Sequence, residues 1–158
     1  MAKDLDVTLK MQAEENFALF GSYRFKVDAK GRVALPSKFR KALSKDLVVS
    51  RELEDKCIYV FEPEGFNKWV KQLFEAGFGG YDAANPQHLL LLTKLKANAD
   101  SVDVDSSGRI TLKQDLREGV GIDREVVLVG NSGRLEIWDA ESYDKTFAEV
   151  DLSVFYKK

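Results

Sequence analysis

The sequence contains one short pattern twice: an aspartate, then an arginine four residues later, with a glycine directly before the arginine. The two copies are Asp28-Ala-Lys-Gly31-Arg32 and Asp105-Ser-Ser-Gly108-Arg109. An aspartate that opens a turn can accept hydrogen bonds from backbone N–H groups two residues on, and glycine adopts a positive φ without steric cost. The arginine guanidinium is a planar fork that matches a phosphate group or the edge of a guanine base. Each copy therefore predicts a turn that presents an arginine to a polyanion.

The same pattern has a simpler interpretation, in which each aspartate only closes its turn and pairs with its own arginine. An exposed ion pair of this kind contributes about 0–1 kcal/mol to stability. One such pentapeptide is a weak signal, but two at equivalent places in a repeat are stronger evidence for a shared role.

The two motifs belong to an internal repeat with an offset of 77 residues. Apolar residues align with apolar residues and arginine with arginine, in pairs that include Val33/Ile110, Arg40/Arg117, Val60/Ile137 and Phe66/Tyr143. We therefore expect two copies of one unit, near residues 21–70 and 98–145, that share one core. A solenoid is disfavoured because it needs about three or more repeats.

Each copy predicts the same order of elements. Alternation of apolar and polar residues predicts a first strand near 23–27 and near 102–104. The turn motif, a second strand and a short helix follow, and then a pair of strands and a helix with an apolar stripe. The stripes are Phe66, Trp69, Val70, Leu73 and Phe74 in the first copy, and Tyr143, Phe147 and Val150 in the second.

Between the copies, Asn85 and Pro86 are typical of the start of a helix. Its leucines, 89–92 and 95, form an apolar band that is wide for the surface of a small protein. This band is either buried between the two copies or used in self-association.

The basic residues are concentrated in the first copy. Residues 21–51 contain nine basic and two acidic residues, a net charge of +7, although the whole chain has a net charge of −2. Residues 98–124 contain four basic and six acidic residues. Arg24 and Lys26 are expected on the outward face of the first strand, with Lys30 at the tip of the turn. The first copy is therefore the expected contact surface for a polyanion.

The composition gives no positive case for an enzyme. His88 and Cys57 are the only histidine and cysteine, and they lack the spacing of a zinc site. The glycine motifs that cradle phosphates are missing as well. We expect no catalytic residue, cofactor, metal ion or small-molecule substrate, and we assign Cys57 to the core and His88 to a structural or surface role.

The chain is expected to be a folded cytoplasmic protein. Of its 158 residues, 44% are hydrophobic and 32% are charged, which suits one ordinary core. No apolar run approaches the roughly 18–20 residues that span a membrane, and the first residues do not resemble a secretory signal. We therefore expect no membrane partner.

Beyond these arguments, the sequence resembles the MraZ family of bacterial transcriptional regulators. The resemblance rests on matching stretches from residue 20 to about residue 145. These are Phe20-Gly21-x-Tyr23, Asp28-x-Lys30-Gly31-Arg32, Leu35-Pro36-x-Lys38-Phe39-Arg40, Asp105-x-x-Gly108-Arg109-Ile110, Gly130…Arg134 and Glu136-Ile137-Trp138.

The resemblance implies an α+β, β-rich fold. Two tandem swapped-hairpin units, similar to AbrB and MazE, would form one pseudo-symmetric double-split β-barrel with flanking helices. The implied segments are an N-terminal extension (1–19), a first unit (20–80), a connecting helix (81–97), a second unit (98–150) and a tail (151–158).

The resemblance also implies sequence-specific binding of double-stranded DNA by a ring-shaped homo-oligomer. Its targets would be repeated promoter sites, and it would repress its own promoter and the division and cell-wall gene cluster from a nucleoid-associated location. The candidate DNA-binding residues are Arg24, Lys26, Asp28, Lys30, Arg32, Lys38, Asp105 and Arg109. Because Asp100 and Asp103 lie near Arg109, we expect a smaller DNA role for Arg109 than for Arg32. The alternative is an antitoxin-like or other protein-binding module of the same fold.

Overall fold

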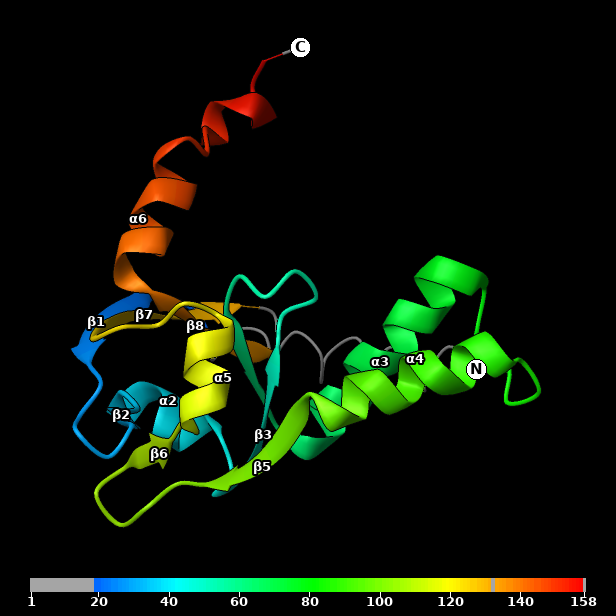
Figure 1. Ribbon diagram of the computed structural model, residues 1–158. Helices are drawn as coiled ribbons and strands as arrows, with labels where there is room; N and C mark the ends of the chain where they lie inside the picture. Colours follow the sequence, from blue (N-terminus) through cyan, green and yellow to red (C-terminus); the bar gives the residue numbers. More distant parts are fainter. Residues whose placement is uncertain (1–18, 132, 158) are drawn as a thin grey trace, which may run out of the picture.

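The computed structural model describes residues 19–131 and 133–157, and it joins a β-rich body to two projecting helical arms (Figure 1). Of the expected N-terminal extension, all but Leu19 lies outside the described residues, as does Ser132 in the turn between the last two strands.

The described chain contains eight strands and five α-helices. The order predicted from the repeat is confirmed: each copy reads strand, strand, helix, strand, strand, helix. The elements are β1 (Ser22–Lys26), β2 (Arg32–Ala34), α2 (Ser37–Ala42), β3 (Asp46–Arg51), β4 (Ile58–Phe61), α3 (Pro63–Phe78), α4 (Pro86–Ala97), β5 (Ala99–Asp103), β6 (Arg109–Thr111), α5 (Gln114–Gly119), β7 (Glu125–Asn131), β8 (Arg134–Asp139), α6 (Ala140–Ala148) and the 3₁₀ turn η1 (Leu152–Phe155).

The strands pair across the two copies rather than only within them. Six strands form an antiparallel sheet in the order β1-β7-β8-β4-β3-β5, while β2 and β6 pair with each other. The first strand of each copy lies beside a strand of the other copy. If each strand is replaced by its equivalent in the other copy, the same strand order results, read from the opposite edge of the sheet. The expected α+β class, with an antiparallel sheet and flanking helices, is confirmed.

One core serves both copies. Val33 and Ile110, at the centres of β2 and β6, have no exposed surface. They belong to a cluster in which Phe39 of α2 and Leu112 after β6 are also buried. Burial of this shared apolar surface is the main force that holds the two copies together.

A second apolar cluster joins α3 to α4 and to the edge of the sheet. Phe61, Phe66, Val70 and Phe74 are buried in it, and Leu92 and Leu95 pack against them. This accounts for two of the five leucines in the band, whereas Leu89, Leu90 and Leu91 are exposed on the outer side of α4. The interpretation that buries the whole band between the two copies is therefore wrong.

Cys57 and His88 both have structural positions. Cys57 is buried, and this burial raises the pKa of its thiol and keeps it protonated. His88 is buried on α4, and its Nδ1 accepts the backbone N–H of Asp82 at 3.0 Å. Within the residues that the structure describes, no helix has the length and apolar character needed to cross a membrane.

Candidate nucleic-acid interface

The two-stranded ribbon of β2 and β6 carries both motif arginines on one face. Its antiparallel register places Arg32 opposite Thr111 and Ala34 opposite Arg109. Side chains of a strand alternate between its two faces, and cross-strand partners share a face. With Val33 and Ile110 directed into the core, Arg32 and Arg109 must lie on the outer face. They are diagonal neighbours there, and each is partly exposed.

The first turn is locked by the Asp28 carboxylate. Its Oδ1 accepts the backbone N–H groups of Lys30 at 2.9 Å and of Arg32 at 2.8 Å. Its Oδ2 accepts Nε of Arg32 at 2.6 Å. The side chain of Arg32 is therefore held by its inner nitrogen, and its two outer nitrogens make no hydrogen bond with the described residues.

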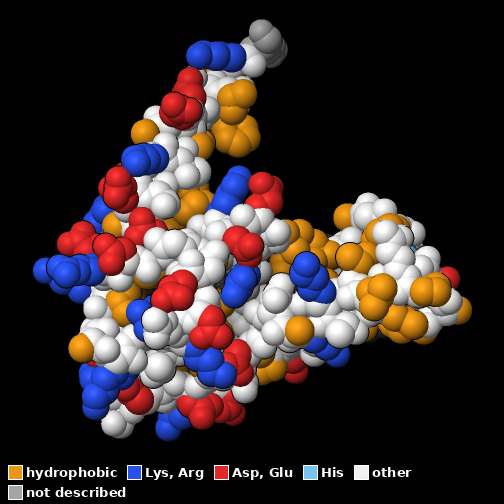
Figure 2. Space-filling view, viewed as in Figure 1, with side chains coloured by type: hydrophobic (Ala, Val, Ile, Leu, Met, Phe, Trp, Pro, Cys, Tyr) orange, Lys and Arg blue, Asp and Glu red, His pale blue; other side chains and the backbone are white. Residues whose placement is uncertain are grey.

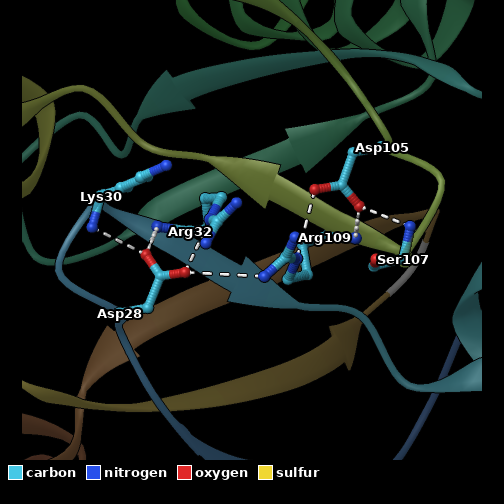
Figure 3. A network of polar contacts seen from close by, with 6 residues as sticks. All are labelled: Asp28, Lys30, Arg32, Asp105, Ser107 and Arg109. Carbon is cyan, nitrogen blue, oxygen red and sulfur yellow. Dashed lines mark hydrogen bonds and ion pairs between the residues drawn. The ribbon is translucent and has the colours of Figure 1, made fainter.

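The second turn repeats this arrangement. Oδ1 of Asp105 accepts the backbone N–H groups of Ser107 and Arg109, each at 2.9 Å, and Oδ2 accepts Nε of Arg109 at 3.2 Å. One further contact joins the two turns, because Nη1 of Arg109 lies 3.8 Å from Oδ2 of Asp28. Figure 3 shows the two arginines side by side, with Arg109 directed toward Asp28. The structure thus brings Asp28, Lys30, Arg32, Asp105 and Arg109 together.

Both interpretations of the motif are present in this geometry. Each aspartate closes its turn and pairs with its own arginine, as the simpler interpretation requires. The same contacts also fix where the guanidinium lies, which reduces the entropy lost when the arginine binds a ligand.

Both carboxylates are stabilised in their charged form. The hydrogen bond from the backbone N–H of Arg32 lowers the pKa of Asp28, and that from Arg109 lowers the pKa of Asp105. Because the pKa values are lowered in the fold, the stabilisation is present at neutral pH and is lost only as the pH falls through the lowered values. The turns therefore remain locked over the physiological pH range.

The other three predicted residues lie outside this cluster. Lys26 is exposed at the end of β1, two residues before Asp28, in keeping with its predicted outward position. Arg24 is also exposed, but its guanidinium pairs with Asp144 of α6, with one contact at 3.3 Å. Nζ of Lys38 lies 3.1 Å from the centre of the Phe20 ring, a cation–π contact.

Two arginines that sequence reasoning left out of the site lie against the turns. Each comes from the short helix of one copy and contacts the glycine of the other copy's turn. A Cβ atom placed on Gly108 would lie 2.5 Å from Cδ of Arg40, and one on Gly31 would lie 3.1 Å from Nη2 of Arg117. Nε of Arg117 also donates to the carbonyl of Leu112 at 3.0 Å. The pairing of Arg40 with Arg117 in the repeat was the signal for this symmetric role.

The glycine in the first turn is required by two features. Gly31 has a φ of +79°, and a Cβ atom there would lie 2.7 Å from the carbonyl oxygen of Leu112. We expect Gly31→Ala to destabilise the protein by roughly 1–3 kcal/mol, from φ strain and this backbone contact. Chemical denaturation measures the effect. Gly79→Ala is the matched control, since its φ is +77° but nothing lies within 4 Å. An equal loss of stability in both variants would contradict the close contact between Gly31 and the carbonyl of Leu112.

A recess beside the first turn is not an anion pocket. It is lined by Lys26, Arg117 and Arg124, but also by Asp28, Asp123 and Glu125. Its basic and acidic side chains are equal in number, so a polyanion is favoured on the outer face of the ribbon instead. Across the described ranges, no group of three or more His, Cys, Asp or Glu side chains is arranged to hold a metal ion.

The sequence motifs of β7 and β8 form a buried network rather than part of the ribbon. Glu136 accepts Nε1 of Trp138 and Nδ2 of Asn131, both at 2.9 Å, and Nη2 of Arg134 at 3.2 Å. The guanidinium of Arg134 lies over the Tyr59 ring, 4.1 Å from its centre. This network joins β8 to its neighbour β4, which assigns these residues to the fold.

Comparison with known proteins supports one family over nearly the whole chain. The family model described as "MraZ protein, putative antitoxin-like" matches residues 18–85 and 95–158. The protein named transcriptional regulator MraZ from Acetivibrio thermocellus is 32% identical over 134 residues, which cover 85% of this chain and 90% of that protein. Its namesake from Micrococcus luteus is 36% identical over 133 residues, 84% of this chain and 89% of that protein. The namesake from Saccharopolyspora erythraea is 37% identical over 123 residues, 78% of this chain and 82% of that protein.

The family match includes both turn motifs, the strands of the ribbon and the helices that brace them. The identities exceed 30% and extend over more than two thirds of the chain in each of the three relatives. With its duplicated aspartate–arginine turns, exchanged strands and shared core, the chain belongs to the MraZ family of transcriptional regulators.

Proposed function

We propose that this protein regulates transcription by binding double-stranded DNA through the outer face of the β2–β6 ribbon and the turn before β2. The observation that carries the proposal is the placement of Arg32 and Arg109 side by side on this face, with Lys30 exposed in the turn and Lys26 exposed at the end of β1, two residues before Asp28. Two outer nitrogens of Arg32 remain available to a phosphate oxygen or to O6 and N7 of guanine. Lysines at the turn add charge, which positions the duplex without reading its sequence.

A single protomer offers few contacts, so we propose that a ring-shaped homo-oligomer places several such surfaces along the DNA. Engagement of regularly spaced promoter repeats by linked copies raises affinity by roughly 10²–10⁴ through effective concentration. An assembly of this size on its own promoter, and on that of the division and cell-wall genes, would exclude RNA polymerase. Repression is therefore the expected output.

We further infer that the exchanged strands represent two AbrB-like swapped-hairpin units fused in one chain. The pairing of β1 with β7 and of β5 with β3, with β2 on β6 between them, supports this assignment. The units would extend over 20–80 and 98–150, with α4 as the link and residues 151–158 as a tail.

The proposal is tested with the DNA upstream of the protein's own gene. A gel-shift titration should show tighter binding to this duplex than to a scrambled duplex of equal length and composition. A reporter driven by the same DNA should lose expression when the protein is present. Equal affinity for both duplexes, with no change in the reporter, would contradict sequence-specific regulation.

The antitoxin-like alternative makes a different prediction for the same surface. A module that neutralises a protein partner would retain its affinity for that partner when the ribbon arginines are replaced by residues that preserve its shape. The net charge of +7 over residues 21–51 favours DNA, because a nucleic acid is the ligand that such an excess attracts most strongly.

Arg109→Ala is expected to weaken DNA binding less than Arg32→Ala does. Nε of Arg109 is bound by Asp105, and Nη1 faces Asp28. More of its guanidinium nitrogens therefore contact the protein itself than is the case for Arg32. Its main role is to position Asp28 and thereby the first turn. Affinity and thermal unfolding of both variants should be compared. A larger loss of affinity in Arg109→Ala would overturn this asymmetry.

A further inference from the structure

In the first copy, aromatic rings fill the space between the first strand and the short helix. Tyr23 of β1 packs edge-on against Phe39 of α2, with ring centres 5.3 Å apart. The ring of Phe20, two residues before β1, lies under Nζ of Lys38 in the first turn of α2. The space between β1 and α2 is therefore occupied by the chain itself.

The second copy has none of these rings at the equivalent positions. At the offset of 77 residues, the replacements from the first copy to the second are Phe20 to Ala97, Tyr23 to Asp100, Lys38 to Asp115 and Phe39 to Leu116. The elements themselves correspond, because β1 and β5 begin at equivalent residues, and so do α2 and α5. Three aromatic rings of the first copy are thus absent from the second.

A recess lies in the second copy where these rings are missing. It consists of two adjoining hollows of about 300 and 230 Å³, and the larger volume is at the lower end of the range for small-molecule sites. The residues that line both hollows are Val49, Asp100, Lys113 and Leu116. The larger hollow includes Ala97 at the end of α4, and the smaller includes Thr111 of β6. In Figure 1 this part of the surface lies between α5 and β5.

An ion pair divides the recess. Nζ of Lys113, directly before α5, lies 2.5 Å from Oδ2 of Asp100 on β5. This hydrogen bond lowers the pKa of Asp100 and raises that of Lys113, so both groups stay charged at neutral pH. An extended peptide along β5 would meet the pair, whereas a small molecule fits on one side of it. The recess therefore suits a small molecule.

The larger hollow combines an apolar floor with charges of both signs. Val49 is only 1% exposed, and Leu116 of α5 is partly buried. The charged residues that line this hollow are Arg51, Asp100, Lys113 and Asp115. Figure 2 shows basic and acidic side chains intermixed over α5 and β5. A ligand that carries one group of each charge matches this lining better than an anion or a cation alone.

Arg51 is the basic residue best placed to bind a carboxylate, since Lys113 is already paired. Nη2 of Arg51 donates to the carbonyl oxygen of Asp115 at 3.4 Å, and a Cβ atom placed on Gly119 would lie 2.6 Å from its Cζ. The guanidinium is therefore held against α5. Its Nε and Nη1 make no hydrogen bond with the described residues, which leaves them to donate to a ligand.

We propose that the recess of the second copy binds a free aromatic amino acid. The ring lies on Val49 and Leu116, in the space that aromatic side chains fill in the first copy. The carboxylate binds Arg51, and the ammonium group pairs with Asp115, which stands where the first copy has the cation of Lys38. The site goes beyond the proposed function and does not depend on it, because none of these contacts involves Arg32 or the first turn.

Calorimetric titration of the full chain with L-phenylalanine tests the site, and we expect saturable binding with one site per protomer. L-Alanine lacks the ring and should bind at least about tenfold more weakly. N-acetyl-L-phenylalaninamide lacks both charges and should also bind at least about tenfold more weakly. No binding of free phenylalanine, tyrosine or tryptophan would overturn the proposal. Equal affinity for the uncharged amide would overturn it too, in favour of a side chain from a protein partner.

Asp100→Tyr tests the location by giving the second copy the ring that the first copy has at Tyr23. The added ring should fill the recess and lower the affinity for phenylalanine by more than about tenfold. Leu116→Phe, which copies Phe39, should weaken binding in the same direction. Thermal unfolding of both variants shows whether the fold is retained. Folded variants that bind phenylalanine as tightly as the wild-type protein would contradict the location.

Arg51→Ala tests the carboxylate contact with a readout that a purely structural role would not give. The variant should bind phenylalanine about tenfold more weakly, because a hydrogen-bonded charge is lost. It should bind phenethylamine, which lacks the carboxylate, as well as the wild-type protein does. Arg124→Ala is the matched control, since Arg124 is exposed and lies outside the recess, and it should keep both affinities. An equal loss for both ligands in Arg51→Ala would overturn the assignment.

Discussion

Arg32→Ala should weaken binding of the protein to the DNA upstream of its gene by about 10–100-fold. A bidentate arginine contact with guanine contributes about 1–3 kcal/mol of discrimination, and about 1.4 kcal/mol corresponds to a tenfold change. In an assembly that uses several copies of the site, the loss is repeated at each engaged protomer. Arg32 is the arginine whose outer nitrogens remain available, because Asp28 binds only its Nε.

A second substitution and a control sharpen this test. Arg32→Lys should restore only part of the affinity, since an ammonium group keeps the charge but loses the planar fork. Lys94→Ala removes a positive charge from the exposed last turn of α4, away from the ribbon, and should leave affinity within about twofold, as expected for a distant, screened charge. An Arg32→Ala protein that folds normally and binds as tightly as the wild-type protein would refute the assignment of the site.

Reversal of charge at the end of β1 and in the first turn should have the second large effect. The double variant Lys26→Glu with Lys30→Glu changes the charge beside the ribbon by four units and should lower affinity by more than about 100-fold, because each lost phosphate contact also loses counterion release. Both lysines are exposed, so the fold should be retained. The affinity is measured by fluorescence anisotropy on a labelled promoter duplex.

The second hairpin provides the matched control for this variant. Ser101 and Ser107 are exposed and occupy the positions equivalent to Arg24 and Lys30 in the repeat. Ser101→Glu with Ser107→Glu adds two negative charges to a hairpin that is already acidic, and we expect little change in affinity. If this control loses as much affinity as the lysine variant, both hairpins contact DNA, and the predicted asymmetry is wrong.

Local patterns were sufficient to predict the elements. Alternating residues marked β1, and the apolar spacing of Phe66, Val70 and Phe74 marked the buried side of α3. Asn85 and Pro86 marked the start of α4 and do begin it. These signals are local because capping, turn geometry and side-chain periodicity depend on a few neighbouring residues.

Local patterns did not predict which strands pair with each other or which distant side chains meet. A repeat shows that two copies exist, but two strands with the same alternation pair equally well within a copy or across copies, so the pairing of β1 with β7 was not predictable. For the same reason, the contact of Arg109 with Asp28 could not be foreseen. Arg24 is exposed on β1 as predicted, but its ion pair with Asp144, which lies 120 residues later in the chain, was beyond local patterns.

The apolar stripes of α3 and α6 also show that local spacing predicts an element but not the segment that covers it. The stripes of α3 and α6 have similar spacing, and an apolar stripe of this kind is buried either in the core or in a contact between subunits. Which of the two applies depends on the chain that follows. After α3 it folds back as α4, and after α6 it extends as an apolar tail, residues 150–156, a difference that the stripe itself does not encode.

The dependence of DNA affinity on ionic strength tests the central claim most directly. If Lys26, Lys30 and Arg32 each neutralise one phosphate, log K should fall against log salt with a slope of about −2.7 per protomer, or roughly 40-fold between about 50 and 200 mM salt. Arg32→Ala should give a shallower slope by about 0.9. An affinity that stays constant over this range would contradict recognition of DNA by the basic ribbon surface.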